Sequence, residues 1–381
     1  MNEKETLILA LINENPFITQ NEIAERLQLS RSAAAGYISG LMKKGEIVGR
    51  AYVIRAEKTI TCIGGANVDR KAVVSGKIQW GTSNPVTTSK SLGGVARNVA
   101  ENLGRLSAPV ALLTVVGDDT EGKWLLEESA TYMNVAQATT FASASTGSYT
   151  AILDQQGEMA LALADMGIYD EIGLAQLGKW WPHIAASSYV LLDMNFPQEV
   201  ITETITRCRS MEIPLCIAPV SSPKAKKLPQ KLEGVALLIA NRDEIETITG
   251  MSLNEIDQFE KAAERLFARG VESVVITNGK HGVHYFDRDG TSGHLAAPPV
   301  HVTDVTGAGD SLTAGVLFGL NRNLPLKEAC ELGMACSYIT LQSAETVSPQ
   351  LNEEKLLHTH EILWRRNRLT EDDVKATQTS K

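Results

Sequence analysis

Short apolar runs alternate with amphipathic segments along most of this 381-residue chain, and this alternation limits the possible fold more than any other feature. The runs are rich in Val, Ile and Leu, as is typical of strands that are buried on both faces of a sheet. Buried strands that alternate with helices predict an α/β fold, in which helices cover both sides of a mostly parallel sheet. The expected strands are residues 109–116, 189–193, 214–218, 235–240 and 273–277, and the expected helices are residues 198–209, 255–268 and 326–341.

Size and composition favour an intracellular enzyme with an accessory domain. A chain of 381 residues exceeds the size at which one core usually stops growing, so we expect more than one domain. The net charge of −9 argues against a nucleic-acid coat or a membrane-surface protein. Five scattered cysteines without a Cys-x-x-Cys pair indicate neither a disulfide framework nor a zinc site. With no secretory signal and no apolar run near the ~18 residues of a membrane span, we predict a cytoplasmic protein without a membrane partner.

Residues 1–56 predict a separate winged helix-turn-helix domain, ahead of a main domain at residues 57–368. An apolar stripe at residues 6–12, a capping-box start at residues 19–22 and a helix at residues 31–44 give three helices. The following segment, residues 45–55, has the pattern of a two-stranded wing. In such a domain the third helix lies in the DNA major groove. The polar tail, residues 369–381, has too few apolar residues to pack, and we expect it to be disordered.

Charge supports DNA binding less strongly than shape does. Residues 1–55 contain seven Lys or Arg and six Glu, so this unit is only slightly basic. Its basic residues nevertheless gather where a winged helix meets phosphates, and they are Arg31, Lys43, Lys44, Arg50 and Arg55. DNA is therefore one expected partner, and a winged helix used for protein contacts or dimerisation is the alternative.

A run of small residues precedes an apolar helix in the segment DVTGAGD, residues 304–310. Small residues let a phosphate approach the backbone, and the first N–H groups of a helix have no intrahelical acceptor. The amides of Gly307, Ala308 and Gly309 are therefore candidates for an anion site. Asp310 would then stand where a base meets an incoming hydroxyl group, as phosphoryl transfer requires. Taken alone, the same residues could simply begin a helix with an aspartate in its first turn.

Five segments in the expected order resemble the PfkB carbohydrate kinase family, whose fold is ribokinase-like. No Walker-type phosphate loop and no Gly-x-Gly-x-x-Gly fingerprint is present to suggest another nucleotide-binding fold. The resemblance implies a kinase that uses ATP and Mg²⁺ to phosphorylate a sugar-like alcohol. The matching segments are residues 64–69 (GGANVD), 93–100 (GGVARNVA), 241–244 (NRDE), 277–282 (TNGKHG) and 304–310 (DVTGAGD).

The resemblance also implies a role for each matched residue. The catalytic groups are the base Asp310 and an anion hole formed by Gly307, Ala308 and Gly309. The substrate-binding residues are Asn67, Asp69, Gly94, Asn98, Asp193 and Asn195. The nucleotide-binding residues are Asn241, Thr277, Gly279 and Gly282. The metal-binding residues are Glu244 for Mg²⁺, through water, and Asp304 and Thr306 for a monovalent cation such as K⁺. Because buried Asn and Asp side chains need partners, bonding to local backbone is the structural alternative for the polar ones.

Residues 71–92 and 141–165 interrupt the alternation of helices and strands and are rich in Thr, Ser and β-branched residues. The resemblance implies that they form a small β-sheet lid, which closes over the sugar and in many members pairs across a dimer. Closure would exclude water, a competing phosphoryl acceptor. We therefore expect a homodimer, with a simple surface hairpin as the alternative for these segments.

Within the family, segments of the lid and the sugar pocket are similar to those of pseudouridine kinases. The implied reaction transfers the γ-phosphoryl group of ATP to the 5′-hydroxyl of pseudouridine, with another nucleoside or a free pentose as alternative acceptors. Arg97 replaces the small residue of ribokinase, which argues against ribose. A ligand-sensing transcriptional regulator built on a kinase fold is a further alternative. The similar segments are residues 83–85, 93–103, 153–159 and 164–166.

Overall fold

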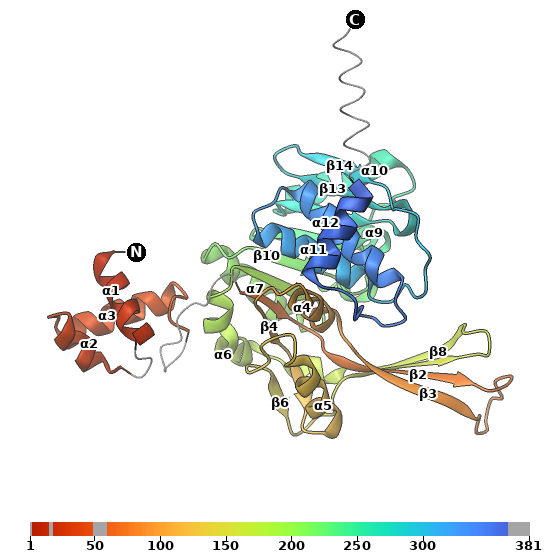
Figure 1. Cartoon of the computed structure of the whole chain (residues 1–381), viewed down its shortest axis with the longest axis horizontal. Helices are drawn as coiled ribbons and strands as arrows, with labels where there is room; N and C mark the ends of the chain where they lie inside the picture. Colours follow the sequence, from red (N-terminus) through yellow and green to blue (C-terminus); the bar gives the residue numbers. More distant parts are fainter. Residues whose placement is uncertain (1, 15–17, 49–58, 365–381) are drawn as a thin grey trace, which may run out of the picture.

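The computed structural model describes residues 2–14, 18–48 and 59–364 (Figure 1). Of the wing expected at residues 45–55, residues 49–55, with Arg50 and Arg55, lie outside the described residues, as does the tail at 369–381. Those two expectations stay predictions. Within the described parts of the chain, no helix is both long enough and apolar enough to cross a membrane.

Three short helices form the N-terminal unit, as the sequence predicts: α1 (Glu3–Glu14), α2 (Gln20–Arg26) and α3 (Arg31–Lys43). Thr19 and Glu22 form the expected capping box at the start of α2. The start of α3 is capped by Ser30 Oγ, which accepts a hydrogen bond of 3.1 Å from the Ala33 amide. The three helices share a buried apolar cluster that includes Ile8, Ile12, Ile23, Ile38 and Leu41.

An eight-stranded sheet lies at the centre of the larger unit, in the order β14-β13-β12-β11-β10-β9-β1-β4. Every neighbouring pair from β12 to β4 is parallel, whereas β13 and β14 are antiparallel. The predicted α/β class with a mostly parallel sheet is therefore confirmed. The strands are β1 (Ile60–Ile63), β4 (Val110–Leu113), β9 (Tyr189–Asp193), β10 (Leu215–Ala218), β11 (Val235–Asn241), β12 (Ser273–Thr277), β13 (Val283–Asp287) and β14 (Ser292–Leu295).

One expected strand is divided in two. Residues 109–116 form β4 and then β5 (Val115–Gly117), which leaves the central sheet and pairs with β6 (Thr139–Phe141). The break falls at Thr114, whose buried hydroxyl donates to Gly64 O at 2.7 Å instead of facing an apolar layer. An apolar run in the sequence does not reveal such a break.

Helices cover both faces of the central sheet and enclose two apolar cores. Leu191 faces one core and Leu192 the other, as expected from the alternation of side chains along a strand. Among the glycines, Gly315 is needed for close helix packing, because a Cβ there would lie 2.7 Å from Gly333 Cα. One face is covered by α4 (Val95–Arg105), α11 (Ala308–Asn321) and α12 (Leu326–Leu341), and the other by α6 (Leu174–Ala185), α7 (Gln198–Ser210), α9 (Arg242–Thr249) and α10 (Ile256–Arg269).

A second sheet of four strands extends away from the body of the larger unit (Figure 1). Its order is β3-β2-β7-β8, and it corresponds to the lid expected from the sequence. The lid begins at residue 67, earlier than the expected residue 71, so Asn67 and Asp69 belong to the lid itself. The strands are β2 (Asn67–Val74), β3 (Val86–Gly93), β7 (Ser148–Leu153) and β8 (Met159–Asp165).

Candidate active site

The polar residues singled out in the sequence gather at the carboxyl edge of the central sheet. Asp193, Asn241 and Thr277 are the last residues of β9, β11 and β12, three of the parallel strands of the central sheet. Gly64 follows β1, which pairs with β9. Ligands of open α/β sheets bind beyond this edge. The topology therefore brings together motifs that are more than 200 residues apart in the sequence.

Asp310 lies in the first turn of α11, behind the N-cap residue Gly307. The φ angle of Gly307 is +78°, and a Cβ there would overlap Thr346 O, so this position requires glycine. At Gly309, in contrast, an added Cβ would meet nothing within 4 Å. The open space at Gly309 lies beside the helix start, where an anion is favoured.

The amides available to an anion differ slightly from those expected. The Ala308 N–H donates to Val305 O at 3.3 Å, and the first bond within the helix runs from the Ser311 amide to Gly307 O at 2.9 Å. Between these two, the amides of Gly309 and Asp310 have no acceptor among the described residues. The Gly307 amide has no backbone acceptor among the described residues either, so the anion site expected at Gly307, Ala308 and Gly309 stays a prediction, with the Asp310 amide as an additional free donor.

The half-buried carboxyl group of Asp310 has an unusual acidity. Burial raises its pKa to about 7, and the negative charges of Asp193, Asp69 and Glu244 act in the same direction. A hydrogen bond of 2.8 Å from Asn98 Nδ2 to Asp310 Oδ2 opposes this rise. A carboxylate whose pKa is near the operating pH is well suited to general base catalysis.

Asn67 and Asp69 lie at the base of the lid. Asn67 Nδ2 donates to Asp69 Oδ1 at 2.6 Å, and burial raises the pKa of Asp69. Both side chains lie on the same face of β2, together with Lys71, because alternate residues of a strand share a face. A Cβ at Gly93, on the paired strand β3, would overlap the Asp69 carboxylate. The two predicted substrate-binding residues are thus neighbours and are held in place by the lid.

Asp193 is fully buried, and both of its oxygens are occupied by local groups. Oδ2 accepts from the Gly65 and Ala96 amides at 2.8 and 3.1 Å, and Oδ1 accepts from the amide and the side chain of Asn195 at 2.9 and 2.8 Å. Asn195 Oδ1 accepts in turn from Lys224 Nζ. Asp193 therefore ties the turn after β1 to the start of α4. These bonds correspond to the structural alternative stated for it.

Gly94 is the N-cap residue of α4, with a φ angle of +100°. A Cβ there would overlap Gly65 O, so any side chain would separate α4 from the turn after β1. Asn98 lies one turn later, within reach of Asp310. Gly94 and Asn98 thus connect the turn after β1 to α11, the helix that carries the candidate base.

Asn241 and Glu244 form a capping box at the start of α9. Asn241 Oδ1 accepts from the Glu244 amide, and Glu244 Oε2 accepts from the Asn241 amide, both at 2.9 Å. Burial raises the pKa of Glu244. Among the described residues no three His, Cys, Asp or Glu side chains gather as a metal cluster. Mg²⁺ usually keeps several waters and binds phosphate oxygens, so a single carboxylate such as Glu244 is compatible with its binding.

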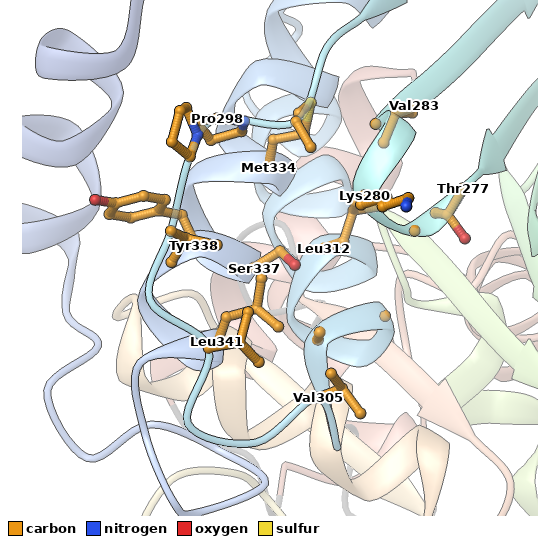
Figure 2. Close-up of a pocket in the computed structure, with 18 residues that line it drawn as sticks. Thr277, Lys280, Val283, Pro298, Val305, Leu312, Met334, Ser337, Tyr338 and Leu341 are labelled. Carbon is orange, nitrogen blue, oxygen red and sulfur yellow. The ribbon is translucent and has the colours of Figure 1, made fainter.

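A cavity of about 580 Å³ lies between the β12–β13 turn, α11 and α12 (Figure 2). Its lining includes Thr277, Gly279 and Gly282, three of the four predicted nucleotide-binding residues, whereas Asn241 lies outside it. Ala308 and Gly309 border the cavity, so a ligand in it would adjoin the anion site. Most of the wall is apolar, as an aromatic base requires. Lys280 and Val305, which lie within the motif segments but were given no role, also line the cavity. The other lining residues lie outside the motifs: Val283, residues 297–300, Val302, Leu312, Met334, Ser337, Tyr338 and Leu341.

The two residues predicted to hold a monovalent cation are already bonded to each other. Asp304 Oδ1 accepts from the Thr306 amide at 2.9 Å and from its hydroxyl at 2.7 Å. Asp304 Oδ2 lies 3.2 Å from the ammonium group of Lys71, which extends from the lid. The carboxylate thus links the lid to the loop that precedes the anion site.

Comparison with known proteins identifies the family. Residues 57–353 match the pfkB family of carbohydrate kinases, and this match includes all five motifs. The chain belongs to this family. It is therefore a phosphotransferase with an alcohol group as acceptor, built on a ribokinase-like fold. Residues 1–48 match a winged helix-turn-helix DNA-binding family, in agreement with the predicted N-terminal domain.

Several relatives resemble most of this kinase. The chain is 30% identical to the "Uncharacterized sugar kinase YeiI" of Escherichia coli over 94% of its length and 98% of the relative. It is also 30% identical to the pseudouridine kinase of Escherichia coli, over 78% of this chain and 95% of that one. A solved carbohydrate kinase from Agrobacterium tumefaciens is 30% identical, with a TM-score of 0.70 over 80% of this chain and 98% of that one. The structure of an Arabidopsis thaliana ribokinase complexed with ribose and ATP, at 18% identity and a TM-score of 0.70 over 80% of this chain and 99% of that one, supports the fold alone.

Proposed function

We propose that this kinase transfers the γ-phosphoryl group of ATP to the 5′-hydroxyl of pseudouridine. The observation that carries the proposal is the setting of Asp310, a half-buried carboxylate with a pKa of about 7 in the first turn of α11, beside the free amides of the helix start. A substrate hydroxyl beside it gives its proton to Asp310 while its oxygen bonds to the γ-phosphorus and ADP leaves. The Gly309 and Asp310 amides stabilise the charge that spreads over the transferred group.

ATP fits the cavity at the start of α11. Its apolar wall suits the adenine base, and the helix start suits the phosphates. Mg²⁺ would neutralise phosphate charge, and Glu244 is the residue we assign to its water shell. Asn67, Asp69 and Asn98 are proposed to bind the hydroxyl groups of the acceptor, while Asp193 and Asn195 hold the loops that carry them.

Pseudouridine is proposed as the acceptor because a pseudouridine kinase is among the relatives that cover almost the whole family domain. The guanosine-inosine kinase of Exiguobacterium acetylicum, 29% identical, supports another nucleoside as the second candidate. The test is a screen of purified protein with Mg-ATP against pseudouridine, uridine, guanosine, inosine and ribose, with the phosphorylated product measured directly. Selective formation of pseudouridine 5′-phosphate is the expected result, and turnover of ribose alone would overturn the substrate assignment.

The proposed dependence on K⁺ rests on Asp304 and Thr306. Their carboxylate and carbonyl oxygens suit a monovalent cation, although the Lys71 ammonium already adjoins Asp304 Oδ2. Rates measured at constant ionic strength in potassium, sodium and choline chloride test this point. Equal rates in all three salts would rule out activation by K⁺.

We further propose that the N-terminal unit binds DNA and that the kinase forms a homodimer through its lid. Gly45 of this unit lies against the kinase domain, since a Cβ built on it would overlap Ala185 O at the end of α6. On β8 the apolar residues Leu161 and Leu163 share one face and are exposed, and Met159 at the start of the strand is exposed as well. Such a face suits pairing with a second copy. Salt-dependent DNA binding by the full chain and its mass in solution test these two proposals separately.

A further inference from the structure

A buried ionic cluster lies on α4 directly behind the candidate base. Arg97 is 5% exposed and pairs with Glu101, which is also 5% exposed. Glu101 also pairs with Arg105 at 2.7 Å, and Arg97 Nε donates to Ser129 Oγ at 3.4 Å. Burying an arginine is costly unless its charge and its donors find partners. Because a hydrophobic residue at this position would lower the stability of the fold less, we looked for a functional role of the cluster.

Arg97 also contacts the residue that bonds to Asp310. Its Nη1 group donates to Asn98 Oδ1 at 3.1 Å, and Asn98 Nδ2 donates to Asp310 Oδ2 at 2.8 Å. The oxygen and nitrogen of an amide have nearly the same shape, so only hydrogen bonds decide which way the group is turned. A guanidinium group is a donor only, so the amide atom that faces Arg97 must be the oxygen. The amide nitrogen then faces Asp310.

We propose that Arg97 is a positioning residue for phosphoryl transfer, because it fixes the amide of Asn98 so that its nitrogen donates to Asp310. This inference rests on the proposed role of Asp310 and goes beyond it. Arg97 touches neither the acceptor nor the nucleotide in this assignment. It acts through Asn98.

The charges around Asp310 explain why the orientation of this amide matters. Asp69 from β2, Asp193 at the end of β9 and Glu244 on α9 all raise the pKa of Asp310. The bond from Asn98 acts against them. Turned the other way, the amide would present its oxygen to the carboxylate and add a fourth repulsion. Fixing the amide therefore keeps Asp310 ionised at a lower pH.

The test is the double variant Arg97→Met/Glu101→Gln, which removes one positive and one negative charge together and so leaves the net charge of the cluster unchanged. We expect the acidic limb of kcat/KM against pH to move up by about 0.5–1 unit and kcat to fall about tenfold, with the KM for ATP nearly unchanged. Titration of the Asp310 carboxyl carbon by NMR, assigned with Asp310→Asn, should show the same rise. This readout does not depend on turnover, so it separates the inference from the proposed substrate and reaction.

Arg105→Met is the matched control. It removes the other cation from the same Glu101, on the same helix, but Arg105 has no bond to Asn98. We expect the pKa of Asp310 to be unchanged in this variant. An equal shift in both variants, or none in the double variant, would overturn the inference. If the double variant does not fold, Arg97→Gln replaces the donor-only group by an amide that can also accept, while Glu101 stays paired with Arg105, and an unchanged pKa of Asp310 there would overturn the inference equally.

Discussion

The two sides of the active site are built from different chemical groups. The proposed nucleotide side is a cavity with mostly apolar walls, bordered by small residues and free amides at the start of α11. The acceptor side is a network of side chains in which Asn67, Asp69, Asn98 and Asp310 bond to one another in pairs. The nucleotide side therefore depends on shape, whereas the acceptor side depends on charge and on the orientation of amides. Substitutions on the two sides should therefore affect different kinetic and stability measurements.

The largest effect is expected for Asp310→Asn. This change keeps the shape of the side chain but removes the base, and general base catalysis contributes about 10²–10⁴-fold. We expect kcat to fall at least 10²-fold, while the dissociation constant of ATP, measured by calorimetry, changes less than about threefold. A variant that keeps turnover within about tenfold of the wild type would remove Asp310 from the mechanism.

The next largest effect compares two glycines of the anion site. Gly307→Ala places a Cβ against Thr346 O at a φ angle of +78°, so the loss should appear as a lower melting temperature. Gly309→Ala meets nothing within 4 Å of the new Cβ, so folding should be unaffected. The added methyl group would instead occupy the space proposed for phosphate, and we expect the KM for ATP to rise tenfold or more.

Both variants are measured by thermal unfolding and by steady-state kinetics. The contrast between them is the prediction, since both exchange a glycine for alanine within one turn of α11. A Gly309→Ala protein with unchanged kinetics would place the phosphates somewhere else. It would leave the cavity without its proposed connection to Asp310.

Much of the fold and of the site could be predicted from the sequence, for a physical reason. Strand alternation and glycine-rich turns are local, and the motifs follow the ends of parallel strands, which meet at one edge. Contacts between distant segments leave no such local pattern. The bond between Asn98 and Asp310 joins residues 212 positions apart, and nothing in either segment indicates it.

The sequence also did not indicate which residues line the cavity. Met334 and Leu341 lie on α12, and on an apolar helix a residue that lines a cavity has the same pattern as a residue of the core. Asp193 illustrates another case, since this carboxylate, predicted to bind substrate, accepts four hydrogen bonds from the protein itself, two of them from distant segments of the chain. Only the packed structure distinguishes these cases.

A third prediction sharpens the comparison between the two sides. Met334→Ala removes part of the apolar wall, which at ~25 cal/mol per Å² of buried surface corresponds to about a tenfold rise in the KM for ATP. The KM for the acceptor should stay the same. Asn67→Ala, at the base of the lid, is expected to do the reverse. Steady-state kinetics with each substrate varied in turn would show it, and a rise in both KM values for either variant would mean that the two sides are coupled.

The smallest expected effect concerns stability. Asp310 has a pKa of about 7 in the folded protein and an ordinary value of 3.8 when exposed. Below about pH 4, Asp310 is protonated in both the folded and the unfolded protein, so its burial does not lower the free energy of unfolding. Above pH 7 both states are ionised, and the folded state alone bears the cost of a charge in a poorly hydrated place. Asp310→Asn should therefore raise the melting temperature at pH 8 by roughly 3–6 °C, which corresponds to about 1–2 kcal/mol.

The pH dependence of this gain in melting temperature shows whether the buried charge or another effect of the substitution causes it. If the cost comes from the buried charge, the difference in melting temperature between variant and wild type narrows steadily from pH 8 to pH 4.5. An equal gain at both pH values would point to packing or to a hydrogen bond of the new amide instead. The cost in stability on the acceptor side would then come from shape and not from charge, and the proposed contrast between the two sides would no longer hold. A gain that vanishes at low pH ties the cost in stability to the same ionisation that makes Asp310 a base.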